Sequence, residues 1–278
     1  MKHKDGFFTG AHKAKIYCQS WLPCGDPVAI IVVSHGLAEH SGRYINLVNR
    51  FVPLGYAIYS LDHLGHGKSE GRRAYVNGFG DFTHTLDMFI SMVTSWQQKR
   101  PIFLLGHSMG ALIAIHLLLD DQRQFSGAIL SGPSVVLPKD ISRHKIAAAR
   151  ILSTLIPTKR LLALDASAVS KDHEVVNAYI SDPLVYNGKI TARLGYELLA
   201  AMKYAMERAL KITLPVLILQ GDADKLVDPG GAHVLYDSIG STDKKLNVYN
   251  GLYHEVLNEP EREHVLDDVQ AWLEAHLA

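Results

Sequence analysis

The chain has 278 residues, of which 47% are hydrophobic and 20% are charged. This composition excludes an intrinsically disordered chain and is sufficient for one domain with a large core. Basic and acidic side chains number 28 each. No basic excess therefore favours nucleic acid or an anionic membrane, and a neutral or amphiphilic ligand fits the balanced charge better.

The first residues and the two cysteines bear on the compartment of the protein. Residues 1–6 carry charge, but they are not followed by the apolar stretch of a secretory signal. Cys18 and Cys24 lack partners at metal-ligand spacing and form no disulfide framework. We therefore expect free thiols and a cytoplasmic location.

Short apolar and β-branched runs recur along the chain and predict the strands of a sheet. They lie at residues 16–21, 29–33, 56–60, 102–105, 127–130, 216–219 and 246–249. Segments with apolar residues at helical spacing lie between them, as at residues 44–51, 82–93 and 265–273. This alternation predicts an α/β fold with a mainly parallel sheet that helices cover on both faces.

The alternation stops between about residues 135 and 210, where helical patterns occur with no convincing strand between them. We expect residues 135–210 to form a helical cap or lid, inserted into a core made by residues 1–134 and 211–278. The cap has more apolar residues than a solvated insertion needs. They include Leu152, Leu155, Ile156, Leu161, Leu162 and Leu164. These residues either pack on the core or, in part, line an acyl-chain tunnel or touch a lipid surface.

The sequence Gly106-His107-Ser108-Met109-Gly110 lies between a predicted strand and a run of helix-forming residues. This is the context of a nucleophile elbow, in which a strained turn exposes the serine Oγ and the flanking glycines prevent clashes. An ordinary glycine-rich turn is the alternative, but the flanking strand and helix favour Ser108 as a nucleophile.

A serine hydroxyl needs a base to accept its proton and a carboxylate to orient that base. In α/β hydrolases the acid follows the nucleophile and the histidine comes last, each in a loop after a late strand. Asp222, Asp224 and Asp228 follow the strand at residues 216–219, and the Gly-x-x-Asp spacing favours Asp224. Sequence alone does not separate these carboxylates, and Asp222 is the main alternative. His254 follows the last predicted strand and is the expected base.

Acyl transfer also requires backbone amides that stabilise the oxyanion, and the loss of one donor costs about two orders of magnitude in rate or more. We expect one amide from Met109, directly after the nucleophile. The other is expected from Leu37, in the loop after the strand at residues 29–33. Leu37 is bulkier than the small residue expected in such a loop, but its bulk does not remove the amide.

Several stretches of the sequence resemble those of the monoacylglycerol lipases, and the likeness spans nearly the whole chain. They are residues 35–44 (HGLAEHSGRY), 62–71 (DHLGHGKSEG), 106–110 (GHSMG), 181–184 (SDPL), 220–224 (QGDAD) and 253–254 (YH). The resemblance implies hydrolysis of monoacylglycerol to fatty acid and glycerol by a serine mechanism, with no metal or organic cofactor. The residues alone indicate only a serine ester hydrolase.

The resemblance also implies which side chains hold the glycerol part of the substrate. They are Glu39, Arg43, His107 and Tyr179, whose polar groups suit hydroxyl recognition. For Glu39 and Arg43 the alternative is an ion pair that only fixes the loop, and the two roles are compatible. His63 and His66 resemble residues that brace the site, so we expect them to be structural.

Two other functions are compatible with the sequence. A lysophospholipase or a broad-specificity carboxylesterase would use the same triad. A charged head group would need cationic partners, and the nearby Lys68, Arg72 and Arg73 are expected to form a solvated turn instead. Some α/β-hydrolase folds are ligand-binding receptors, but these usually lack a triad member.

The apolar cap also favours peripheral contact with a membrane. The neutral net charge supplies no additional electrostatic attraction to a membrane.

Overall fold

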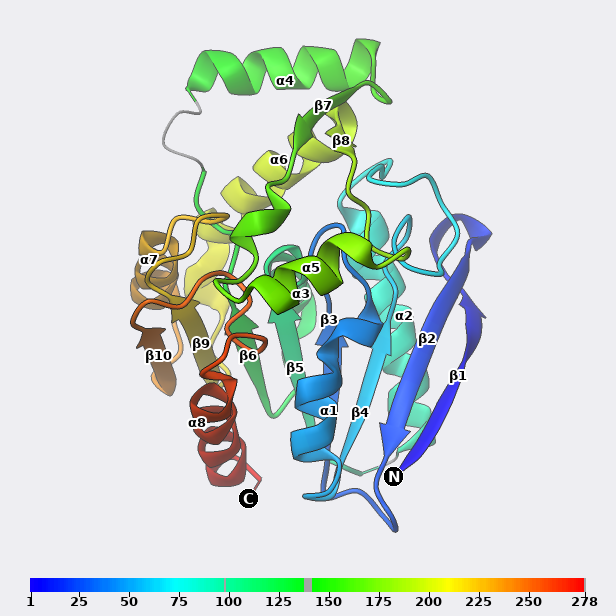
Figure 1. The fold of residues 1–278 in the computed structure, drawn as a ribbon, viewed down its shortest axis with the longest axis vertical. Coiled ribbons are helices and arrows are strands. Elements are labelled where there is room, and N and C mark those ends of the chain that lie inside the picture. Colours follow the sequence, from blue (N-terminus) through cyan, green and yellow to red (C-terminus); the bar gives the residue numbers. More distant parts are fainter. Residues whose placement is uncertain (98, 138–141, 278) are drawn as a thin grey trace.

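The fold is built on a sheet of eight strands in the order β1-β2-β4-β3-β5-β6-β9-β10 (Figure 1). It is seen in a computed structural model that describes residues 1–97, 99–137 and 142–277. The strands are β1 (Lys2–Thr9), β2 (Lys15–Leu22), β3 (Ala29–Ser34), β4 (Tyr56–Leu61), β5 (Ile102–His107), β6 (Gly127–Ser131), β9 (Val216–Gly221) and β10 (Lys244–Tyr249). β2 pairs antiparallel with β1 and with β4, and the pairs from β4 to β10 are parallel. The predicted mainly parallel sheet is confirmed.

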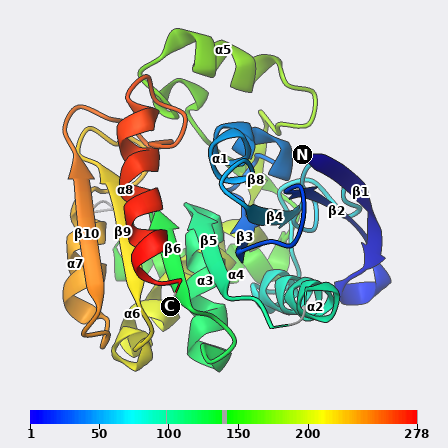
Figure 2. The same ribbon diagram turned by 90° about the horizontal axis from the view of Figure 1, so that it is seen from below.

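Helices cover both faces of this sheet (Figure 2). They are α1 (Ile45–Phe51), α2 (Gly80–Trp96), α3 (Met109–Asp121), α6 (Ala192–Arg208), α7 (Gly230–Ser238) and α8 (Arg262–Ala275). Side chains of α2, α3, α6 and α7 form one buried cluster with the sheet, and those of α1 and α8 form another. Alternate residues of β3 divide between the two clusters, as Ile30 and Ile31 do. A strand buried on both faces is apolar throughout, which is why the sequence revealed it.

The remaining elements lie beyond one end of the sheet, opposite both termini (Figure 1). They are α4 (Arg143–Leu155), β7 (Arg160–Ala163), α5 (His173–Ser181) and β8 (Lys189–Thr191). α6 then packs against both α4 and α3 and so connects this region to the core. In the described part of the chain, no helix is long and apolar enough to cross a membrane.

The prediction that no strand lies between residues 135 and 210 is wrong. β7 and β8 pair antiparallel there, with Leu162 opposite Ile190. All four residues of β7 are exposed, so no alternation of buried and exposed positions marks the strand in the sequence. β1 was not predicted for the same reason. Its first four residues are all exposed, and the strand is defined by its pairing with β2.

Candidate active site

Ser108 occupies a strained turn between β5 and α3. Its backbone angles are φ 54° and ψ −115°, a region that costs a non-glycine residue free energy and that clusters at functional sites. A Cβ atom at Gly106 would lie 2.5 Å from the Gly110 carbonyl oxygen, and one at Gly110 would lie 2.0 Å from that of Ser34. Both positions therefore require glycine, and the turn packs directly on the end of β3.

His254 and Asp224 form a hydrogen-bonded pair. Asp224 Oδ2 lies 2.7 Å from His254 Nδ1 and also accepts from Gln220 Nε2 at 3.0 Å. Asp224 Oδ1 accepts from the amides of Leu226 and Val227 at 2.8 and 3.1 Å. Burial would raise the pKa of Asp224, but its interactions with His254 and these amides outweigh burial and lower it. An ionised Asp224 fixes Nδ1 as the donor and leaves His254 Nε2 to act as the base.

The structure also places the two carboxylates that the sequence could not separate from Asp224. Asp222 Oδ1 accepts from the Gly251 amide at 2.6 Å, which joins the loops after β9 and β10. Asp228 Oδ1 accepts from the Gly230 amide at 3.0 Å, at the start of α7. The carboxylate that lies on His254 is that of Asp224.

Ser108, His254, Leu37 and Met109 line one cavity of about 540 Å³, within the usual size range of small-molecule sites. Within the described residues, no hydrogen bond joins the Ser108 hydroxyl to His254. Among the same residues, the backbone amides of Leu37 and Met109 have no hydrogen-bond acceptor. Two unpaired amides beside a strained serine are the arrangement that an oxyanion requires.

The part of the cavity formed by α4, β7 and the residues around them is mainly apolar. It includes four of the leucines that the sequence singled out, Leu152, Leu161, Leu162 and Leu164. Polar side chains on the lining include Glu39, His107, Tyr179 and Glu255. The cavity thus combines an apolar region with a set of hydrogen-bonding groups beside Ser108.

Arg43 connects three of these polar groups. Its Nη2 donates to Glu255 Oε2 at 2.7 Å, and its Nη1 contacts Glu255 Oε1 and donates to Glu39 Oε2 at 3.1 Å. Its Cζ lies 4.5 Å from the centre of the Tyr179 ring. Burial would raise the pKa of Glu39, but Arg43 and nearby histidines lower it to about 2. Arg43 is not itself a lining residue of the cavity. Its ion pairs fit the alternative given above, in which Arg43 and Glu39 fix the loop.

Glu255 was missed by the sequence analysis. It is 5% exposed and binds Arg43 through both carboxylate oxygens. The one signal in the sequence is an acidic residue directly after His254. The partner lies 212 positions away, so only the fold brings the pair together.

The histidines near the site are buried, and they differ in their position relative to the cavity. The His107 ring lies 4.6 Å from that of His254, and burial together with this neighbour lowers the pKa of His107 to about 4. His63 Nε2 contacts Ser34 Oγ at 3.0 Å and His66 Nδ1 contacts the Leu64 carbonyl at 3.0 Å. Neither His63 nor His66 lines the cavity. Within the described residues, no group of three or more His, Cys, Asp or Glu side chains is arranged to hold a metal ion.

Comparison with known proteins identifies the family. Residues 25–261 match the family described as serine aminopeptidase, S33. The chain is 38% identical over 270 residues to a monoacylglycerol lipase of Mycolicibacterium smegmatis, covering 97% of this chain and 96% of the relative. It is 39% identical over 267 residues to a monoglyceride lipase of Rattus norvegicus, covering 95% and 88%. The crystal structure of Paleococcus ferrophilus monoacylglycerol lipase superposes with a TM-score of 0.84 at 31% identity, covering 94% of this chain and 99% of that one. The chain therefore belongs to the monoacylglycerol lipases, within the S33 family of α/β hydrolases.

Proposed function

We propose that this protein hydrolyses monoacylglycerols to free fatty acid and glycerol through an acyl-enzyme on Ser108. One observation carries the proposal: the hydrogen-bonded pair of His254 and Asp224 lies with Ser108 at a cavity that is apolar toward the cap and polar beside the nucleophile. An amphiphile with a long acyl chain and a small neutral head matches both parts of this cavity.

In the acylation step, Ser108 Oγ forms a bond to the ester carbonyl carbon while His254 Nε2 accepts its proton. The carbonyl electron pair moves to oxygen, where the Leu37 and Met109 amides donate hydrogen bonds to it. Asp224 stabilises the imidazolium through Nδ1. The bond to the glycerol oxygen then breaks, and His254 donates its proton to the leaving oxygen.

In the deacylation step, a water molecule gives a proton to His254 and bonds to the acyl carbon. The bond from this carbon to Ser108 Oγ breaks, Oγ regains the proton from His254, and the fatty acid leaves. Both steps require Ser108 Oγ and His254 Nε2 to come within hydrogen-bond distance when substrate is bound, a contact that often tightens only then.

The polar lining supports recognition of the glycerol head. Glu39, His107 and Tyr179 offer acceptors and donors to two hydroxyl groups, while Arg43 holds Glu39 in place. A buried site built to bind hydroxyls discriminates strongly against a substrate without them. The acyl chain adds affinity with less selectivity, at roughly 0.8 kcal/mol for each buried methylene.

The charge of the polar lining disfavours the lysophospholipase alternative. Glu39 and Glu255 bring two carboxylates, and Arg43 is already bound to both. Lys68, Arg72 and Arg73 are not lining residues. The lining cation is Lys145, which lies on α4 of the cap. A phosphate beside Ser108 would therefore meet the Glu39 and Glu255 carboxylates, with Arg43 bound to both.

We also infer that residues 135–210 act as a lid on a core made by residues 1–134 and 211–278. Residues 138–141 of this segment lie outside the described residues. Large apolar side chains are exposed on the lid, with Leu155 73%, Leu162 60% and Ile151 58% exposed. Such a surface favours peripheral contact of a cytoplasmic enzyme with a lipid surface, from which the substrate would enter.

The experiment that tests the activity compares kcat/KM for four substrates of matched acyl chain: a monoacylglycerol, the diacylglycerol, lysophosphatidylcholine and a simple alkyl ester. The Ser108→Ala variant is the blank. We expect the monoacylglycerol to lead. A flat or lysophospholipid-led profile would indicate a broader esterase or a lysophospholipase, and turnover independent of Ser108 would refute the mechanism.

A further inference from the structure

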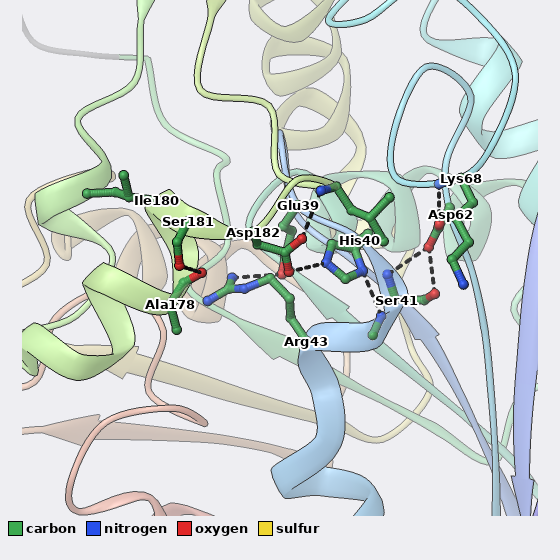
Figure 3. A network of polar contacts seen from close by, with 12 residues as sticks. Glu39, His40, Ser41, Arg43, Asp62, Lys68, Ala178, Ile180, Ser181 and Asp182 are labelled. Carbon is green, nitrogen blue, oxygen red and sulfur yellow. Dashed lines mark hydrogen bonds and ion pairs between the residues drawn. The ribbon is translucent and has the colours of Figure 1, made fainter.

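Two hydrogen bonds join the cap to the loop that carries the Leu37 amide, and Figure 3 shows one of them, between Asp182 and His40. The turn after α5 returns toward the core, and its Tyr186 amide donates to the Ala38 carbonyl at 2.8 Å. The same turn places Asp182 Oδ2 2.9 Å from His40 Nε2. These contacts fall one and three residues after Leu37, so the cap touches the loop directly beside the expected oxyanion donor.

The contact between His40 and Asp182 has one arrangement of donors and acceptors when the ring is neutral. His40 Nδ1 accepts from the Gly42 amide at 3.1 Å, so Nε2 carries the hydrogen and donates to Asp182. The other oxygen of Asp182, Oδ1, accepts from the Leu184 amide at 2.8 Å. Partial burial would raise the pKa of Asp182, but the hydrogen bonds from His40 and Leu184 outweigh burial and lower it. Both carboxylate oxygens are therefore occupied as acceptors.

The core holds the far end of the same loop through a second aspartate. Asp62 Oδ1 accepts from the Ser41 amide at 2.8 Å and from its hydroxyl at 2.6 Å, while Oδ2 accepts from the Lys68 amide at 2.7 Å (Figure 3). Ala38 lies between the end of β3 and Ser41, and its φ of 70° is in the left-handed region. A non-glycine residue pays free energy for this conformation and keeps it only under external restraint.

We propose that Asp182 is a positioning residue of the oxyanion hole, which acts from the cap through His40 and, together with the Tyr186 amide, keeps the Leu37 amide directed at the cavity. The position of the cap and the geometry of the catalytic site are thereby linked. This inference rests on the proposed role of the Leu37 amide.

The test uses Asp182→Asn, which keeps the shape of the side chain. One of its two terminal atoms becomes a donor, so it cannot accept from both His40 and Leu184. His40→Ala removes the same contact from the other side, and the double variant should lose no more than the larger single loss. The matched control is Arg193→Met, because Arg193 Nε makes another hydrogen bond from the cap to the core, to the Asn77 carbonyl at 2.7 Å, away from the oxyanion loop.

Three quantities are measured for each variant: kcat on a short water-soluble ester, Ki for an alkyl trifluoromethyl ketone, and Ki for a monoalkylglycerol ether. The ketone forms a tetrahedral oxyanion on the serine, whereas the ether only fills the cavity. Loss of a whole oxyanion donor costs about 100-fold in kcat or more. We therefore expect a displaced donor in Asp182→Asn and His40→Ala to cost about tenfold in kcat and a similar factor in ketone Ki. The ether Ki and all Arg193→Met values should stay within about twofold of wild type.

Unchanged kcat and ketone Ki in the Asp182 and His40 variants would overturn the inference, and so would an ether Ki that weakens as much as the ketone Ki. Melting temperatures identify a variant that fails to fold, and the other variant then decides the outcome. Failure of the proposed function itself looks different: the wild-type enzyme would then hydrolyse the ester independently of Ser108 or fail to bind the ketone.

Discussion

The two amides expected to bind the oxyanion are held in different ways. Met109 begins α3 directly after a turn whose glycines pack against the end of β3 and against α3 itself. Leu37 lies in a loop fixed by side chains and by a turn of the cap. One half of the site is therefore set by backbone packing in the core, and the other depends on polar contacts, some with the core and some with the more exposed cap. Substitutions in the core should therefore abolish ester hydrolysis, whereas substitutions on the cap side should lower its rate by a smaller factor.

The largest effect is expected from Ser108→Ala, which removes the nucleophile from the core side of the site. Knockout of an equivalent serine in a serine protease costs about a million-fold in kcat, and we expect a loss of the same order. Steady-state hydrolysis of a monoacylglycerol by purified protein measures it. Activity near the wild-type level would refute the assignment of Ser108.

The next largest effect is expected from Asp224→Asn, because an amide cannot hold His254 in the tautomer that leaves Nε2 as the base. The corresponding change in a serine protease lowers kcat about 10⁴-fold. Asp222→Asn is the matched control, since within the described residues the hydrogen bond of the Asp222 carboxylate is to the Gly251 amide, away from His254. The assignment would be reversed if the Asp222 variant lost more kcat than the Asp224 variant.

A third prediction concerns stability on the polar side of the cavity. The pKa of Glu39 is lowered from 4.5 to about 2, so ionised Glu39 stabilises the fold above its ordinary pKa and this contribution disappears as the pH falls toward 2. Denaturant unfolding between pH 5 and pH 2 should show a steeper loss of unfolding free energy in the wild type than in Glu39→Gln. Parallel curves would show that Glu39 is not the group responsible.

The smallest effect is expected on the outer surface of the cap. Replacing exposed Leu155 with Ser should leave kcat/KM on a soluble short-chain ester unchanged, because the side chain does not line the cavity. Its loss should reduce binding to phosphatidylcholine vesicles in a flotation assay by about tenfold, which corresponds to the lower end of the roughly 1.5 to 3 kcal/mol for burial of a leucine side chain. A wild-type protein that never floats would contradict membrane contact through the cap.

The core side of the site could be predicted from the sequence because its constraints are local. The glycines around Ser108 and the apolar runs before and after it share one short segment, and buried parallel strands are apolar throughout. The sequence also predicted that the carboxylate beside His254 comes from the loop after β9. Its spacing favoured Asp224 but did not exclude Asp222, because the outcome depends on which carboxylate faces His254 across the fold.

The cap and the polar lining of the cavity could be predicted only in part, because their contacts join distant residues. β7 is wholly exposed and shows no hydrophobic pattern. Glu255 and Asp182 carry no local sign of their partners, which lie 212 and 142 positions away. Ion pairs and hydrogen bonds of this kind are created by the fold, so propensity and periodicity do not reveal them.

We expect one cavity to combine a serine nucleophile with recognition of glycerol hydroxyls. The most direct measurement is the ratio of kcat/KM for a monoacylglycerol to kcat/KM for the methyl ester of the same fatty acid, which has no free hydroxyl. We expect a ratio well above ten, by analogy with sites that hydrogen-bond substrate hydroxyls, and a ratio that falls toward one in Glu39→Gln. Equal kcat/KM values for the two esters in the wild type would contradict it.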